Sequence, residues 1–290
     1  MPEDKTQKVI DALREVCECK GVVPISLLES TTGVMAWISN IIPLARPWTA
    51  MLWSALHAAK LQSAAGPKRD TTRVRKGLAF KRQIDHAVLW LHRLLEAKGT
   101  FLDGSPVVSL SKVYRFKHDV PLVSVITDAC PSGLGGYLEI GGKPVAYFKL
   151  PVDESLCTTL GGGATVGDPA FQTEWELLAI FIAICIFSKF LKRTHVRMFI
   201  QSDNTAALRA ALEFHASSPL MSSLAAEMAI RIECAGWEPL WGKHIRGIHN
   251  TVADALSRFC EGIPLPECLK SAREIVVPDV ATLFRTWPHA

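Results

Sequence analysis

Several features that assign a chain to a class at first sight are scarce in this sequence. The eight cysteines follow no repeating spacing, and Cys17 and Cys19 form a lone C-x-C without a second pair. Structural zinc sites use paired ligand motifs, so we expect reduced thiols and an intracellular location instead. The longest apolar run, Leu177–Phe187, is shorter than the roughly 20 residues that cross a bilayer. No signal peptide is visible in the charged N-terminal segment, and we expect no membrane partner.

The charge balance of the chain excludes few kinds of partner. The chain has 32 lysines and arginines against 28 aspartates and glutamates, and the net charge of +4 is compatible with a polyanionic partner without requiring one. Basic residues gather over 68–82, just before an apolar helical stripe. This segment is either the solvated start of a helix or a contact with a nucleic-acid backbone, for which Arg75 and Lys76 are the candidates.

Residues 1–115 have the pattern of a mostly α-helical region. Apolar residues recur at helical spacing within Lys5–Lys20. The segment Ser26–Glu29 has the form of a capping box that opens a second helix, and a third is expected over Pro47–Gln62. These three segments predict a separate helical region before residue 116.

From residue 116 the pattern changes to strands that alternate with helices. The expected order is βββαβααβα, which predicts an α/β fold with a mixed five-stranded sheet flanked by helices over 116–260. A glycine pair at Gly141 and Gly142 predicts a hairpin within this sheet. We expect the apolar helix over Phe171–Leu191 to be buried on most sides, and 151–169 to form a loop. Residues 261–290 are expected to form a C-terminal tail.

Four acidic residues stand out because each lies beside an apolar segment. They are two aspartates that follow strands, a glutamate in the first turns of the apolar helix and an aspartate near the start of the last helix: Asp128, Asp203, Glu176 and Asp254. A carboxylate beside a core is costly unless something pairs with it. Magnesium prefers oxygen ligands, and two such ions can activate a water and stabilise the leaving oxygen of a phosphodiester. Taken singly, each acid could also be a turn residue or a partner of a helix dipole.

The segments around these acids resemble, in order, the four motifs of retroelement ribonuclease H domains. They are Thr127–Gly136, Glu174–Ala179, Ser202–Leu208 and His244–Arg258. The last is the most distinctive, because it ends in Ala-Asp-Ala-Leu-Ser-Arg. The pattern is similar to that of gypsy-type and tyrosine-recombinase (DIRS-like) retroelement reverse transcriptases.

This resemblance implies a two-metal site that hydrolyses the RNA strand of RNA–DNA hybrids. The cofactors would be two Mg²⁺ ions, with Mn²⁺ as a substitute, and the ligands would be Asp128, Glu176, Asp203 and Asp254. Glu176 is preferred to Glu174 because it directly precedes Leu-Leu-Ala, as the metal ligand of the family does. Glu174 remains the alternative for the second position.

Further residues acquire expected roles from the same motifs. His244 lies ten residues before Asp254, the offset at which related nucleases carry a histidine that aids proton transfer or product release. It could equally be an ordinary histidine at a strand end. The expected contacts with nucleic acid near the site are Asn204, Asn250, Arg246 and Lys243.

Glycines crowd the first of the four motifs. We expect Gly133, Gly135 and Gly136 to serve the hairpin, although small residues there would also let a nucleic-acid backbone approach closely.

The Tyr-x-Asp-Asp motif of the polymerase is absent, because the only tyrosines are Tyr114, Tyr137 and Tyr147. The chain is therefore not expected to be a complete reverse transcriptase. Its segment Gly33–Ser39 resembles the thumb or connection that follows the polymerase palm, so the polymerase part is an expected partner beside the hybrid.

Two rival functions remain open from the sequence. One is a catalytically inactive ribonuclease H-like relic that still binds nucleic acid. The other is a different enzyme on the same fold, such as a transposase-type nuclease or an actin-like ATPase. The Asp254 motif on a final helix fits ribonuclease H better than an integrase pattern, whereas the absence of a P-loop does not exclude an actin-like ATPase.

Overall fold

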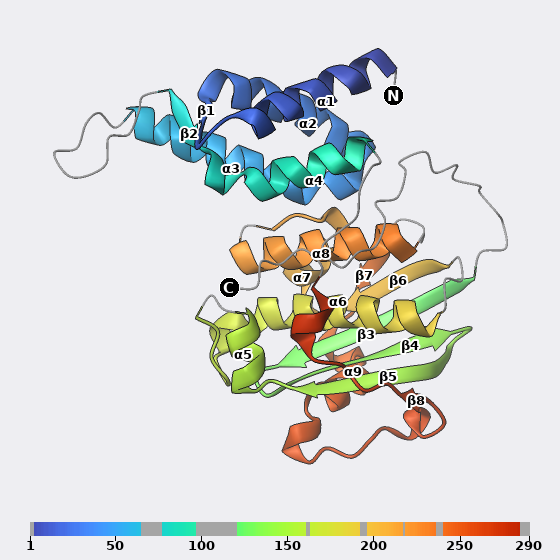
Figure 1. Cartoon of the computed structure of the whole chain (residues 1–290). Coiled ribbons are helices and arrows are strands. Elements are labelled where there is room, and N and C mark those ends of the chain that lie inside the picture. The colour runs from blue at the N-terminus through green and yellow to red at the C-terminus, as the bar shows by residue number, and fades with distance from the viewer. Residues whose placement is uncertain are drawn as a thin grey trace. The chain divides into compact units, whose positions relative to one another are not determined.

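The computed structural model describes residues 3–64, 77–96, 121–160, 163–191, 196–216, 218–235 and 240–284. The chain forms two compact units, an N-terminal unit of residues 1–114 and a C-terminal unit of residues 115–290 (Figure 1). Arg75 and Lys76, the predicted basic contacts, lie outside the described residues.

The N-terminal unit is helical, as the sequence predicted. Its helices are α1 (Glu3–Glu18), α2 (Ile25–Ile41), α3 (Arg46–Ala64) and α4 (Asp85–Glu96). Two short strands that the sequence did not indicate, β1 (Val22–Pro24) and β2 (Leu78–Phe80), pair antiparallel beside them. The core includes Trp48, which stacks on Trp90 with ring centroids 4.5 Å apart.

The predicted capping box at Ser26 is wrong. The helix α2 already begins at Ile25, so Ser26 lies inside its first turn, and the preceding Pro24 makes no side-chain cap. Because Pro24 is also the last residue of β1, the chain passes directly from strand to helix and leaves no position for a capping serine.

The C-terminal unit is built on a mixed sheet, one strand wider than predicted. Its order is β7-β6-β3-β4-β5-β8, with the inner pairs β3–β4 and β4–β5 antiparallel and the others parallel. The strands are β3 (Leu122–Cys130), β4 (Gly133–Ile140), β5 (Lys143–Pro151), β6 (Arg197–Ser202), β7 (Trp241–His244) and β8 (Arg273–Glu274). The hairpin between β4 and β5 turns at Gly141 and Gly142, both at positive φ, as predicted.

The helix α6 (Gln172–Phe190) is the centre of this unit. Every residue from Trp175 to Phe187 is at most 3% exposed. The helix packs on β3 and β4 and is covered by α7 (Thr205–Glu213) and α8 (Pro219–Ala235) (Figure 1). With its flanking turn it is long and apolar enough to cross a membrane, but most of it is buried within the unit. It is therefore a core helix, as the sequence predicted.

The helix α9 (Thr251–Ser257) lies on the opposite face of the sheet (Figure 1). A Cβ at Gly133 would lie 2.3 Å from the Ser257 carbonyl oxygen, and one at Gly135 would lie 2.5 Å from the Ser257 nitrogen. A Cβ at Gly136 would instead meet Phe148, whose ring contacts Phe187 of α6. Gly133 and Gly135 thus let α9 approach one face of β4 closely, and Gly136 leaves room for the Phe148 ring.

Two segments of this unit contain more structure than expected. The predicted loop over 151–169 contains a helix, α5 (Glu154–Leu160), whose start is capped by the Asp153 carboxylate accepting from the Leu156 nitrogen at 2.8 Å. The tail contributes β8 and the buried Leu269, which packs with Tyr147 and Leu256 on the face of α9. The proline and glycines that flank α5 masked its pattern in the sequence.

Gly135→Ala should destabilise the C-terminal unit by about 1–3 kcal/mol, because its methyl group would overlap the backbone of α9. The matched control is Gly33→Ala in α2, where nothing lies within 4 Å, and a gain of about 0.5–1 kcal/mol is expected there. Hydrogen exchange on peptides from each unit reports the two free energies separately. Equal effects of the two substitutions would contradict the close packing of α9.

Candidate metal centre

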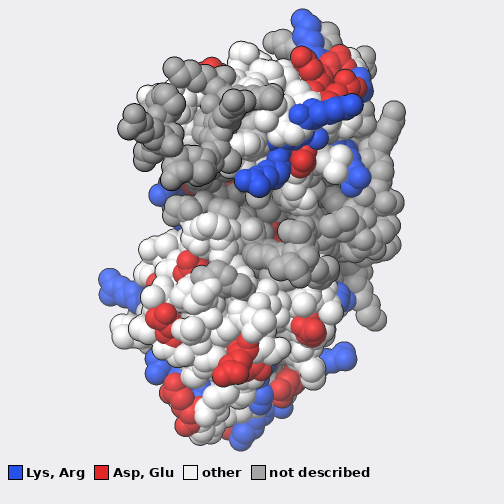
Figure 2. Space-filling model, turned by 60° about the vertical axis from the view of Figure 1, so that its left-hand side comes forward, with Lys and Arg blue, Asp and Glu red and all other residues white. Residues whose placement is uncertain are grey.

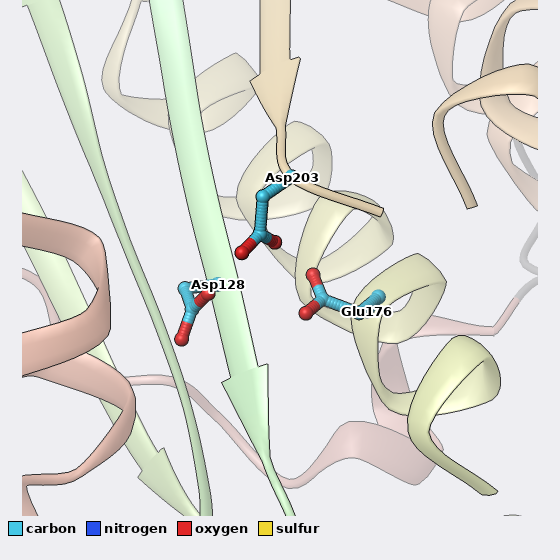
Figure 3. A group of neighbouring side chains, drawn as sticks. All are labelled: Asp128, Glu176 and Asp203. Carbon is cyan, nitrogen blue, oxygen red and sulfur yellow. The ribbon is translucent and has the colours of Figure 1, made fainter. Parts of the chain in front are cut away.

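Three of the predicted acids converge at one edge of the sheet. Asp128 comes from β3, Asp203 follows β6 and Glu176 comes from α6, and one oxygen of each lies within 4.8 Å of the others (Figure 3). The register explains the meeting of the aspartates, because β3 and β6 run parallel with Ile126 opposite Gln201. Two residues further along both strands, Asp128 and Asp203 lie side by side. We refer to these three side chains as the carboxylate cluster.

Asp128 is held by the last helix. Its side chain is buried, with the Ser257 hydroxyl donating to Oδ2 at 2.6 Å and the Asn250 amide donating to Oδ1 at 3.3 Å. The same Asn250 amide donates to the Thr127 carbonyl oxygen at 3.1 Å, and the residue is only 2% exposed. Asn250 thus helps to position Asp128, and its predicted contact with nucleic acid stays a prediction.

Glu176 has polar neighbours from three segments. Its Oε1 accepts from the Ala129 nitrogen at 3.4 Å and from the Gln172 amide at 3.3 Å, and its Oε2 accepts from the Ser202 hydroxyl at 3.4 Å. Glu174 lies in the first turn of α6, is only partly buried and is not part of the cluster. The geometry therefore brings Glu176, the preferred residue, to the aspartates.

Burial makes the cluster hard to ionise. It raises the pKa of Asp128 to about 7, against the opposing hydrogen bond from Ser257. Burial, followed by the charges of Asp128 and Asp203, raises the pKa of Glu176 to about 9. A divalent cation would stabilise all three carboxylates in their ionised form, and an all-oxygen donor set suits Mg²⁺ or Mn²⁺. The residues present therefore fit such an ion.

The fourth predicted acid stands apart from the other three. The Oδ1 of Asp254 accepts from Nε of Arg258 at 2.7 Å, and the Asp254 side chain is 43% exposed. Its charge still contributes to the raised pKa of Asp128, so it lies near the cluster without being part of it. The predicted four-carboxylate arrangement is thus present as three converging groups and one held by an arginine.

His244 ends the edge strand β7 and lies opposite Ser202 in the register. Its Nε2 is 2.9 Å from the carbonyl oxygen of Asp203, and because a carbonyl only accepts, Nε2 must carry the proton. The imidazole is exposed and adjoins the backbone of a cluster residue.

The other predicted contacts have different surroundings. Lys243 and Arg246 are exposed, and a Cβ at the following Gly247 would lie 3.0 Å from Oδ2 of Asp203, so this loop borders the cluster. Asn204 caps α7, its Oδ1 accepting from the nitrogens of Ala206 and Ala207. These bonds give Asn204 a structural role at the start of α7, and its predicted contact with nucleic acid stays a prediction.

Three supporting residues were not singled out from the sequence: Gln172, Ser202 and Ser257. Gln172 could have been found, because it precedes Glu176 by four residues and so faces it along the helix. Ser257 lies inside the last motif, but its partner Asp128 is set by the docking of α9 and not by local spacing.

Stability of the metal-free protein should fall as the pH rises. The ordinary pKa values of these two acids are 3.8 and 4.5, whereas the folded values are about 7 for Asp128 and about 9 for Glu176. The folded chain therefore binds more protons than the unfolded chain between about pH 4 and about pH 9, and its unfolding free energy declines across that range. Thermal unfolding in a chelator, compared with the Asp128→Asn/Glu176→Gln double variant, isolates this contribution. A wild-type decline no steeper than that of the double variant would contradict it.

Comparisons with known proteins give distant likenesses to solved structures. No family model matches the chain, and no curated protein matches it. Among solved structures, LC11-RNase H1 in complex with an RNA/DNA hybrid is similar at 14% identity, with a TM-score of 0.36, over 47% of this chain and 92% of that chain. So low a score carries no argument about activity. The mixed sheet, with α6 on one face and α9 on the other, is the α/β arrangement that the sequence predicted.

Proposed function

We propose that the C-terminal unit hydrolyses the RNA strand of RNA–DNA hybrids with divalent cations. The observation that carries this proposal is the convergence of Asp128, Glu176 and Asp203 from three separate elements. Carboxylates that meet at one sheet edge can hold the divalent cations of a metal-dependent phosphodiesterase. The raised pKa of the two buried members is typical of a functional site.

The chain's own residues hold the metal ligands in place. Asp128, Glu176 and Asp203 would hold the first ion, and Asp254 would complete the site for a second. Bound Mg²⁺ supplies an activated water and stabilises charge on the phosphate. Ser257 and Asn250 fix the orientation of Asp128, while Gln172 and Ser202 fix that of Glu176. Products with 3′-hydroxyl and 5′-phosphate ends are expected.

Recognition of the hybrid would rest on its shape. Among the described residues on the face in Figure 2, acidic and basic side chains are interspersed and neither sign forms a broad patch. A protein that recognises a hybrid by its backbone shape and 2′-hydroxyls needs only a few positive side chains near the cleavage site. The exposed Lys243 and Arg246 beside the cluster could supply them. His244, next to Asp203, is placed to move a proton or to help product leave.

An active enzyme accounts for the site better than a binding relic does. Buried carboxylates destabilise a fold unless they are compensated, and a relic gains nothing from them. Here Asp128 and Glu176 are both buried and each keeps dedicated hydrogen-bond donors.

The wider setting extends the proposal to the whole chain. A thumb or connection region over 1–115, a nuclease domain over 116–260 and a tail over 261–290 would together form part of a retroelement reverse transcriptase, acting inside the cell. The motif order and the helical N-terminal unit support this setting.

Asp203→Asn should lower cleavage of a labelled RNA–DNA hybrid by about a hundredfold or more, because it removes a metal ligand, while binding of the hybrid persists. Asp153→Asn is the matched control, since asparagine can still cap α5. Cleavage is followed over a Mg²⁺ titration. Undiminished cleavage by Asp203→Asn would overturn the proposal, and wild-type binding without cleavage at every Mg²⁺ concentration would favour the relic.

A second pair of variants tests the choice between two neighbouring glutamates. Glu176→Gln should reduce cleavage by about a hundredfold or more, because Glu176 belongs to the cluster, whereas Glu174→Gln should change it by less than about threefold. Both substitutions replace a carboxyl group with an amide of nearly the same size near the start of α6. A larger loss from Glu174→Gln would reassign the second ligand.

A further inference from the structure

The last turn of α9 contains an ion pair that involves a residue of the proposed site. Nε of Arg258 donates to Oδ1 of Asp254 at 2.7 Å, and Nη1 of the same arginine lies 3.8 Å from Oε2 of Glu261. The side chains of Arg258 and Asp254 are 45% and 43% exposed, so either can move without unpacking the core.

The backbone that carries Asp254 is fixed more firmly than its side chain. The Ser257 hydroxyl donates to Asp128 and also to the carbonyl oxygen of Asp254, at 2.9 Å. Gly133 and Gly135 let the backbone at Leu256 and Ser257 lie directly against β4. Asp254 can therefore change its distance to the cluster by rotating its side chain, whereas a shift of the helix would break these contacts.

We propose that Arg258 is a positioning residue that holds the Asp254 carboxylate outside the carboxylate cluster and competes with a divalent cation for it. This inference rests on the proposed function. Its chemical basis is that a guanidinium stays charged at every working pH, so the competition does not lapse. The positive charge of Arg258 also reaches the cluster, where it opposes the rise in the pKa of Asp128.

Such competition makes the two metal positions unequal. The first ion needs only the three carboxylates that already converge. The second needs Asp254, which must first leave Arg258. Arg258 thereby sets the metal concentration at which the complete site forms.

Mn²⁺ titrations by calorimetry, without nucleic acid, test this directly. Arg258→Gln should tighten the weaker Mn²⁺ site about two- to fivefold, the range expected for losing a partly exposed ion pair. Arg258→Lys keeps the positive charge and should therefore tighten Mn²⁺ binding at the weaker site less than Arg258→Gln does. The matched control is Arg209→Gln on α7, which removes a similar pair four residues apart, between Nε of Arg209 and Glu213 at 3.0 Å. It should leave both sites unchanged.

Hybrid cleavage by Arg258→Gln should reach half its maximum rate at a Mg²⁺ concentration that is lower than for the wild-type protein by about the same two- to fivefold factor. If Arg258 only stabilised the fold, its replacement would weaken metal binding. Tighter binding by Arg258→Gln therefore separates competition for Asp254 from a merely structural role. Unchanged or weaker Mn²⁺ binding by a folded Arg258→Gln protein would overturn the inference, even if wild-type protein cleaves the hybrid. If wild-type protein binds no Mn²⁺ and cleaves nothing, the proposed function fails as well.

Discussion

The convergence of three carboxylates, two of them buried, is the constraint on which the C-terminal unit depends. Asp128 and Glu176 are almost inaccessible, and Asp203 lies within 4.8 Å of both at the nearest oxygens. In water such groups ionise freely, but here burial raises the pKa of two of them well above the ordinary range. The arrangement is stable in ionised form only with a compensating positive charge, which is the physical reason to assign it to metal chemistry.

Much of the fold serves to hold that cluster. The parallel register of β3 and β6 aligns the two aspartates, and the buried helix α6 brings the glutamate to them. On the other face, glycines in β4 admit α9 close enough for Ser257 and Asn250 to bond Asp128. Packing and site geometry are therefore parts of one arrangement, since a side chain at Gly135 would displace the helix that orients a ligand.

The sequence predicted those features that follow from periodicity and strand ends. Asp128 and Asp203 follow apolar strands, and the ends of parallel strands meet, so their convergence could be anticipated. The state of Asp254 could not, because a residue four positions from an arginine can pair with it or turn elsewhere. The burial of Asn250 could not be anticipated either, because it arises only when α9 docks on β3. The helix α5 was missed because glycine and proline flank a segment of only seven residues.

The most direct test of the account is anomalous diffraction from crystals soaked in Mn²⁺. An anomalous peak is expected within coordination distance of oxygens from Asp128, Glu176 and Asp203, with Asp254 drawn away from Arg258 when a second peak is present. The absence of any peak at the cluster, in a crystal that leaves it open to solvent, would contradict the assignment of these carboxylates to a metal site.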